Sequence, residues 1–165
     1  MDPAAQKFVG LIGHPVKSRL FLLWKLPAAF FSGVRIRKID MDRSVVSVPY
    51  KWLTQNPFRS TYFASLAMAA EMSTGALAMI HVYNRSPAVS MLITNMDATY
   101  LKKATGRTFF VCEGGKQIKE TIESSIDANE SKSVTVTSTG TNKNGELIAI
   151  FHFTWSFKVK NSKGF

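Results

Sequence analysis

The sequence has little that could bind a metal ion or cross-link the chain. Its 165 residues include one cysteine, Cys112, and three histidines. A single cysteine cannot form an intramolecular disulfide, which fits the reducing conditions of the cytoplasm. Cysteine and histidine are also too few and too scattered for the ligand spacing of a structural zinc site. We therefore expect a cytoplasmic protein with no metal ion and no resident cofactor.

Two common functional motifs are also missing. No Gly-x-Ser-x-Gly elbow is present, which excludes the serine hydrolases that depend on one. Gly114-Gly115-Lys116 lacks the rest of a phosphate-binding loop and indicates a turn.

Two single residues that could be reactive are interpreted as structural. Cys112 has no base near it in the sequence, so we interpret it as an inert core thiol. His152 alternates with phenylalanines, which favours a partly buried structural histidine over a catalyst.

Acidic residues are scarce beside basic ones. The chain has 21 Lys and Arg against 11 Asp and Glu, a formal net charge of +10. Such a charge favours anionic partners, although solubility explains it equally well. The basic residues are spread along the chain, with small groups at 35–38 and 158–163 and no uninterrupted run of the kind found in nucleic-acid-binding arms. We therefore expect no nucleic-acid partner.

Apolar residues are abundant. They make up 45% of the chain and include 12 phenylalanines, which excludes extensive disorder. The length predicts one domain. Residues 1–15 show no clear periodicity and predict a loose lead-in, whereas Val16 to about Phe31 predicts one or two short helices broken at Pro27. We expect residues 1–32 to form a helical lead-in that packs on a single domain of residues 33–165.

Strand patterns begin after Gly33. The runs VRIRKID and SVVSVPY, separated by Met41-Asp42-Arg43, predict a β-hairpin. Alternating or β-branched segments predict four more strands, and isoleucines at every fourth position predict a short helix. These strands are expected at residues 88–100, 107–112, 133–139 and 147–160, and the short helix at 116–126.

Residues 61–82, TYFASLAMAAEMSTGALAMIHV, predict a long helix that Ser60 or Thr61 can cap. Its apolar and small residues surround the whole circumference, so it should be buried on nearly every side. The segment is long enough to span a bilayer, but Glu71 at its centre disfavours a membrane span. Residues 20–24 are apolar too, and a helix packed on the core is favoured over a peripheral membrane anchor. The sequence therefore predicts an α+β fold, in which a curved antiparallel sheet of about six strands wraps a buried central helix.

The order of elements and the segment NPFRSTYFASLAMAAE resemble the hot-dog fold, in particular the phenylacetyl-CoA-type acyl-CoA thioesterase superfamily. LWKLPAAFFSGVRIRKID resembles an uncharacterised, unknown-function branch of it. The active families carry Asn, Gly at +3, His-Gly-Gly at +6 to +8, and Asp or Glu at +15. This sequence keeps Asn56 and Glu71, but has Arg59 at the glycine, Tyr62 at the histidine and Phe63-Ala64 at the two glycines. The resemblance implies a thioesterase acting on an acyl-CoA, with coenzyme A as part of the substrate, in a homodimer or a tetramer.

The residues themselves suggest how a thioester could be hydrolysed. Free amides at Tyr62 to Ala64, at the positive end of the helix dipole, could hold the carbonyl oxygen. Burial would raise the pKa of Glu71 into the range of a general base, and the carboxylate could also act as a nucleophile. Asn56 could orient the water or the substrate carbonyl. Arg59, Phe63 and Ala64 would contact the substrate.

Helix geometry adds a condition. Tyr62 and Glu71 are nine residues apart, or roughly 13 Å along a helix, so one subunit cannot bring both to the same carbon atom. Two subunits with antiparallel helices could, which predicts an obligate homodimer with two shared sites.

Other interpretations remain open. Glu71 could be a buried acid paired for structural reasons, Asn56 an ordinary turn residue, and Tyr62 an aromatic plug instead of a hydroxyl donor. Arg59 could either close the substrate slot or meet a phosphate. The lost His-Gly-Gly element favours a second function, a non-catalytic hot-dog protein that binds an acyl or CoA ligand or acts as an assembly unit.

Overall fold

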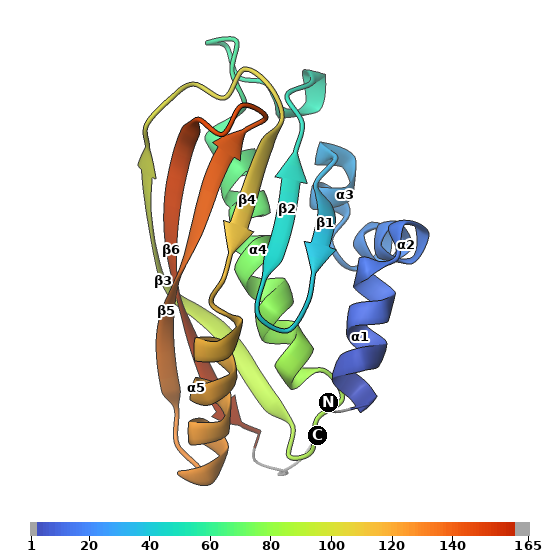
Figure 1. Ribbon diagram of the computed structural model, residues 1–165, viewed down its shortest axis with the longest axis vertical. Coiled ribbons are helices and arrows are strands. Elements are labelled where there is room, and N and C mark those ends of the chain that lie inside the picture. Colours follow the sequence, from blue (N-terminus) through green and yellow to red (C-terminus); the bar gives the residue numbers. More distant parts are fainter. Residues whose placement is uncertain (1–2, 161–165) are drawn as a thin grey trace.

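The computed structural model describes residues 3–160 and contains a six-stranded sheet and five α-helices in that range. The sheet wraps around one long helix, as expected from the sequence (Figure 1). The helices are α1 (Pro3–Gly13), α2 (Pro15–Lys25), α3 (Pro27–Ser32), α4 (Phe63–Val82) and α5 (Gly115–Asp127), with a short 3-10 helix η1 (Trp52–Thr54). The strands are β1 (Arg35–Ile39), β2 (Ser44–Val48), β3 (Val89–Tyr100), β4 (Thr108–Cys112), β5 (Lys132–Asn142) and β6 (Leu147–Val159).

All neighbouring strands are antiparallel, in the order β1-β2-β4-β5-β6-β3. The predicted hairpin is β1–β2, in which Ile36 pairs with Val46. β3 lies at one end of this order and pairs only with β6 among the described strands, so its other edge is free. A curved antiparallel sheet around a central helix is the predicted α+β hot-dog arrangement, and the prediction is confirmed.

The central helix α4 is buried because apolar and small side chains surround it. Leu77 and Ile80 are fully enclosed, and alanines allow strands β2, β4 and β5 to approach the helix backbone. Two hydroxyl groups on the helix are paired with the sheet: Trp155 Nε1 donates to Thr74 Oγ1 at 3.0 Å, and the Ser73 and Ser138 hydroxyls lie 2.8 Å apart. These buried bonds fix the rotation of α4 against the sheet.

Among the described residues, α4 is the one helix long and apolar enough to cross a bilayer. About two thirds (67%) of its most apolar window is buried within the fold. Its apolar surface is therefore already used by the sheet, as in a core helix.

β6 supplies the largest block of the core. Phe151, Phe153, Trp155 and Phe157 are buried, while the residues between them face the other side of the sheet. The predicted alternation is confirmed over the centre of the strand. Leu147, at its first position, is exposed.

The first residues were expected to be a loose lead-in, and that expectation was wrong. Residues 3–13 form α1, which buries Ala5, Phe8 and Ile12 against α4 and β1. The Phe8 ring lies 4.8 Å from that of Tyr83, just after α4. His14 then caps α2, because its Nδ1 accepts from the amides of Val16 and Lys17. The predicted break at Pro27 separates α2 from α3.

Candidate functional site

Asn56 organises the loop that leads into α4. Its Oδ1 accepts from the amide of Phe58 at 3.0 Å and from both the amide and the hydroxyl of Ser60 at 3.2 Å. A bridge between Gln55 and Thr61 closes the loop. The side-chain oxygen is therefore used within the turn, and the backbone amide of Asn56 donates to the Ser60 carbonyl at 2.9 Å, while the side-chain nitrogen Nδ2 donates to no partner among residues 3–160. That side-chain nitrogen remains available to a ligand.

Arg59 lies in the middle of this loop with φ 56°. This is the left-handed region, which glycine adopts without cost and other residues adopt rarely. The backbone conformation thus gives a physical reason for a glycine at this place in the thioesterase motif. The Arg59 side chain is exposed and is not among the residues that line the neighbouring cavity.

The start of α4 differs from the prediction by two residues. The helix begins at Phe63 with Tyr62 as its N-cap, and no side chain caps it. The expected caps are used elsewhere: the Ser60 hydroxyl donates to Asn56, and the Thr61 hydroxyl donates to the carbonyl of Ala104. The Tyr62 amide is also taken, since it donates to the Thr54 carbonyl at 2.7 Å. The uncapped first-turn amides are therefore those of Phe63 and Ala64.

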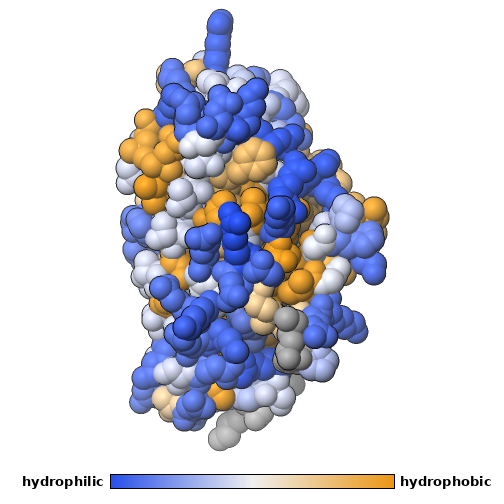
Figure 2. All heavy atoms as spheres, in the orientation of Figure 1, coloured by the Kyte–Doolittle hydropathy of each residue, from blue (hydrophilic) through white to orange (hydrophobic). Residues whose placement is uncertain are grey.

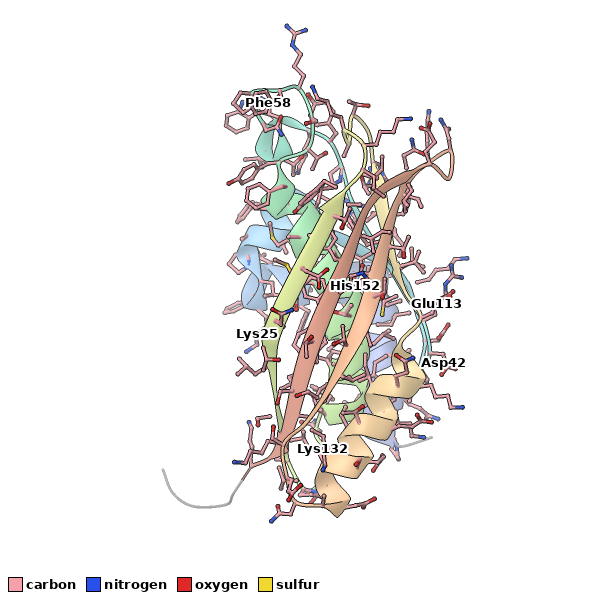
Figure 3. The ribbon with its side chains drawn as sticks, turned by 90° about the vertical axis from the view of Figure 1, so that its left-hand side faces the viewer. Lys25, Asp42, Phe58, Glu113, Lys132 and His152 are labelled. Atoms are coloured by element: carbon pink, nitrogen blue, oxygen red, sulfur yellow. The ribbon has the colours of Figure 1, made fainter. Side chains whose placement is uncertain are left out.

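A cavity of about 570 Å³ lies beside this helix start. Tyr62 and Phe63 are 46% and 55% exposed, with ring centroids 4.8 Å apart, and Phe63 packs edge-on against Tyr100. Figure 3 shows Phe58 at the same end of the molecule, beside the start of α4. Ala64 is half-buried and is not part of the lining. The lining comprises residues 56–58, 60–63, 66 and 100–104.

Glu71 lies in a second cavity, of about 420 Å³, between α4, β1, α1 and α2. The other lining residues are almost all apolar, and Lys25 is the one basic side chain among them. Glu71 is half-buried, and no hydrogen bond or ion pair joins its carboxylate to another of residues 3–160. Removal from water raises the pKa of Glu71 from 4.5 to about 7.

Gly75 makes room for the Glu71 carboxylate one turn further along α4. A Cβ at Gly75 would lie 2.7 Å from Glu71 Oε1 and 3.3 Å from the Trp155 ring. Real Cβ atoms do not approach oxygen that closely, so a larger residue here would displace the carboxylate. Gly75 is a site residue that the sequence interpretation missed.

The structure thus groups Asn56, Tyr62 and Phe63 around one cavity and places Glu71 in another. The two linings share no residue. α1 and α2, which supply Phe8, Phe21 and Leu22 to the Glu71 cavity, were not expected to take part. The apolar spacing of Phe8 and Ile12 was the signal that could have revealed α1.

Two other residues have the environments of structural groups. Cys112 is buried, and burial raises the pKa of its thiol to about 11, so the reactive thiolate is disfavoured. The ring of His152 lies 3.0 Å from the Thr137 hydroxyl, on the outer face of the sheet (Figure 3). Among residues 3–160, no three His, Cys, Asp or Glu side chains group closely enough to hold a metal ion.

Comparison with known protein families assigns the chain to one of them. A family model described as a domain of unknown function, DUF4442, matches residues 18–157. The chain belongs to the DUF4442 family. The match takes in the loop around Asn56, the helix start and Glu71, as well as the whole sheet apart from its last residues. No curated protein matches the sequence.

Solved structures resemble this DUF4442 chain over nearly its whole length. A Pseudomonas aeruginosa protein of unknown function, described as a "Probable Thioesterase", has 17% identity and a TM-score of 0.74, and the match covers 92% of this chain and 100% of that one. A Chlorobaculum tepidum protein of unknown function has 16% identity and a TM-score of 0.74, covering 92% and 99%. A Haemophilus influenzae thioesterase has 9% identity and a TM-score of 0.62, covering 91% and 95%. At these identities the similarity shows a thioesterase-like hot-dog fold.

Proposed function

We propose that this protein hydrolyses an acyl-CoA thioester, with Glu71 as general base or nucleophile, at a site shared between two subunits. The observation that carries the proposal is the Glu71 carboxylate, which has no partner among residues 3–160 and lines an apolar cavity. A carboxylate with a pKa raised to about 7 is suited to accept a proton near neutral pH. The thioesterase-like fold supports the choice of reaction.

As a general base, ionised Glu71 takes a proton from water while the water oxygen bonds to the thioester carbon. The carbon–sulfur bond then breaks, and the leaving thiolate recovers the proton, which gives a carboxylic acid and free coenzyme A. As a nucleophile, a Glu71 oxygen attacks the carbon itself, and the carbon–sulfur bond breaks to release the coenzyme A thiolate, which takes a proton from water. A second water then hydrolyses the resulting anhydride to the carboxylic acid and free Glu71. In both routes the negative carbonyl oxygen needs donors, and the uncapped amides of Phe63 and Ala64 fit that role.

The remaining residues of the helix start bind and orient the substrate in this proposal. The free amide of Asn56 holds the water or the carbonyl, and the Tyr62 hydroxyl donates to the reacting group. Phe63 lines the cavity beneath the thioester and Ala64 contacts the substrate through its backbone amide, while Arg59, outside the lining, meets a phosphate of coenzyme A. Lys102 and Lys103 border the same cavity and add positive charge for that anion.

The separation of the two cavities within one chain supports a homodimer in this proposal. β3 offers a free edge of 12 residues, on which Leu92 and Met96 are 66% and 47% exposed. Exposed apolar edge strands pair readily with another strand. In the proposed dimer two β3 edges pair antiparallel, each Glu71 meets the partner's helix start, and such dimers pair into tetramers.

One observation favours the second candidate, a non-catalytic protein that binds an acyl or CoA ligand or acts as an assembly unit. Tyr62 and Phe63 replace small or catalytic residues of the active motif and lie over the helix start with their rings in contact. This aromatic cover narrows the approach to the amides. Binding of an acyl-CoA without turnover would identify this function.

The test is a panel of acyl-CoA substrates with a thiol reagent that detects released coenzyme A. We expect turnover by the wild type and a loss of at least ~100-fold in Glu71→Gln, as for removal of a general base. Glu113→Gln, which changes an exposed carboxylate on the far side of the sheet, is the matched control and should retain activity. Undiminished hydrolysis in Glu71→Gln would show that the base is misassigned.

A further inference from the structure

The outer face of the sheet carries a basic cluster that the proposed function does not use. In β1, Ile36 pairs with Val46 and Lys38 with Val45, so Arg37 is an extra residue in a β-bulge. A bulge interrupts the alternation of side chains. As a result Arg35, Arg37 and Lys38 are all exposed, while Ile36 and Ile39 contact the core. Without the bulge, Arg37 and Lys38 would face opposite sides.

Arg37 extends this cluster across the neighbouring strands. Its Nε donates to the Ser47 hydroxyl of β2 at 2.7 Å, so the guanidinium lies over β2. On the far side of β2, Arg107 directly precedes β4, and Ser47 pairs with Phe109 in the sheet register. Residues far apart in the sequence are thus brought to one surface, which faces the viewer in Figures 1 and 2.

The surface is hollowed at this place. A cavity of about 580 Å³ is bordered by Arg37, Lys38, Arg43 and Arg107, and no acidic residue lines it. Its floor consists of Val45, Phe109 and Val111, which are half-buried. Figure 2 shows hydrophilic side chains spread over the strands on this face, with apolar groups visible between them. Cations therefore surround a small floor that includes one aromatic ring.

Most positive charges in the cluster are not neutralised by the described part of the protein. Among residues 3–160, no ion pair involves Arg35, Arg37, Lys38 or Arg107. Arg43 is the exception, since its Nε lies 3.2 Å from Glu113. Burial, together with repulsion by Arg107 and Arg35, lowers the pKa of Arg37. Like charges held this close destabilise the fold unless an anion binds between them.

We propose that this cluster binds the phosphates of a nucleoside polyphosphate, with Phe109 as the platform for its base. Arginine guanidiniums match phosphate oxygens in bidentate geometry, and an aromatic ring can stack on any base. The cluster is short: Glu113 and Asp42 border it at the hairpin end, where Figure 3 shows both beside the start of α5. That size suits one small polyanion and not a continuous nucleic-acid track.

Titration calorimetry with ATP on the purified full-length protein tests this site. The double variant Arg37→Gln/Arg107→Gln keeps a donor for Ser47 and should weaken ATP binding at least ~10-fold, since charged hydrogen bonds are lost. Lys116→Gln/Lys143→Gln removes two cations elsewhere and should leave the dissociation constant unchanged. Phe109→Leu should weaken ATP binding while leaving binding of inorganic triphosphate unaffected, because only the nucleotide has a base to stack.

Thermal unfolding gives an independent measurement that does not depend on catalysis. ATP should raise the melting temperature of the wild type. At low salt and without ATP, the arginine double variant should melt no lower than the wild type, because repulsion between the arginines is relieved.

Coenzyme A carries the same adenosine polyphosphate chemistry, so its competition with ATP identifies the source of the ligand. Competition would assign the cluster to the substrate's nucleotide, and lack of competition would assign it to a free nucleotide. The proposal is overturned by equal ATP binding in both double variants, by no ATP binding, or by micromolar binding of a single-stranded oligonucleotide alone.

Discussion

At the scale of single residues, the proposed function depends on Glu71. Its carboxylate lies among apolar side chains of α1, α2 and α4, with Gly75 leaving the space it occupies. An acid in such a place is costly to ionise, and a fold keeps an unpaired buried charge only where it is compensated or used. The cost should therefore be visible in the stability of the protein.

We predict that the contribution of Glu71 to stability falls as the pH rises from about 4.5 to 7. The folded protein holds the Glu71 proton more tightly than the unfolded chain does, because the pKa of Glu71 is raised from 4.5 to about 7. The contribution of Glu71 to the free energy of unfolding is therefore greatest below pH 4.5, declines between pH 4.5 and 7, and is constant above pH 7. The total decline is on the order of 3 kcal/mol, given ~1.4 kcal/mol per pH unit.

Glu71→Gln cannot ionise and should lack this decline. Denaturant unfolding at one fixed protein concentration should show the variant close to the wild type at pH 4.5 and more stable by up to about 3 kcal/mol at pH 8. A difference that stays constant between these two pH values would show that Glu71 is not the titrating group.

At the scale of elements, the loop before α4 and the first turn of that helix form a unit. Asn56 holds the loop, Arg59 turns it with a positive φ, and Tyr62 ends it as an N-cap without a capping side chain. The free amides of α4 depend on this loop, because Ser60 and Thr61 bond to Asn56 and Ala104 instead of to the helix.

Arg59→Gly should stabilise the protein by about 1 kcal/mol, because glycine adopts the left-handed region without the steric cost that arginine meets. Denaturant unfolding measures the change. As a control, Lys103→Gly replaces a loop residue that has no positive φ and should destabilise slightly. Destabilisation by Arg59→Gly would mean that its side chain stabilises the loop more than its backbone strains it.

Most elements could be predicted from the sequence because their signals are local. Alternation identified β6, β-branched runs identified the β1–β2 hairpin, and Pro27 ended α2. Features that depend on tertiary contacts could not be predicted. The cap of α4 is one, since the Thr61 hydroxyl bonds to Ala104, 43 residues away. The enclosure of Glu71 by α1 and α2 is another such feature, because it depends on how the helices pack and no local sequence motif encodes it.

At the scale of the whole molecule, two features of the single chain are consistent with a role for a second chain. Within residues 3–160 one edge of β3 is unpaired, and the two cavities at the helix start and at Glu71 are separate. In the proposed dimer, symmetric pairing along β3 would cover this edge and bring each Glu71 to the helix start of the other chain.

Leu92→Lys/Met96→Lys should therefore weaken the dimer and remove activity together. Both side chains are exposed in the single chain, so the fold should persist, while two added charges on each edge repel across the interface. Light scattering after size exclusion should show monomers where the wild type is dimeric. The control Leu147→Lys, at the start of β6, should remain dimeric and active; a dimeric double variant would place the interface elsewhere.

The central claim, a site shared between two subunits, is tested most directly by mixing two inactive variants. Glu71→Gln lacks the base, and Phe63→Pro lacks one carbonyl-binding amide at a first-turn position where proline is tolerated. Refolding or co-expressing equal amounts, with heterodimers verified by native mass spectrometry, should restore about a quarter of wild-type activity, because half of the dimers then contain one intact site. Heterodimers as inactive as either parent would contradict the account.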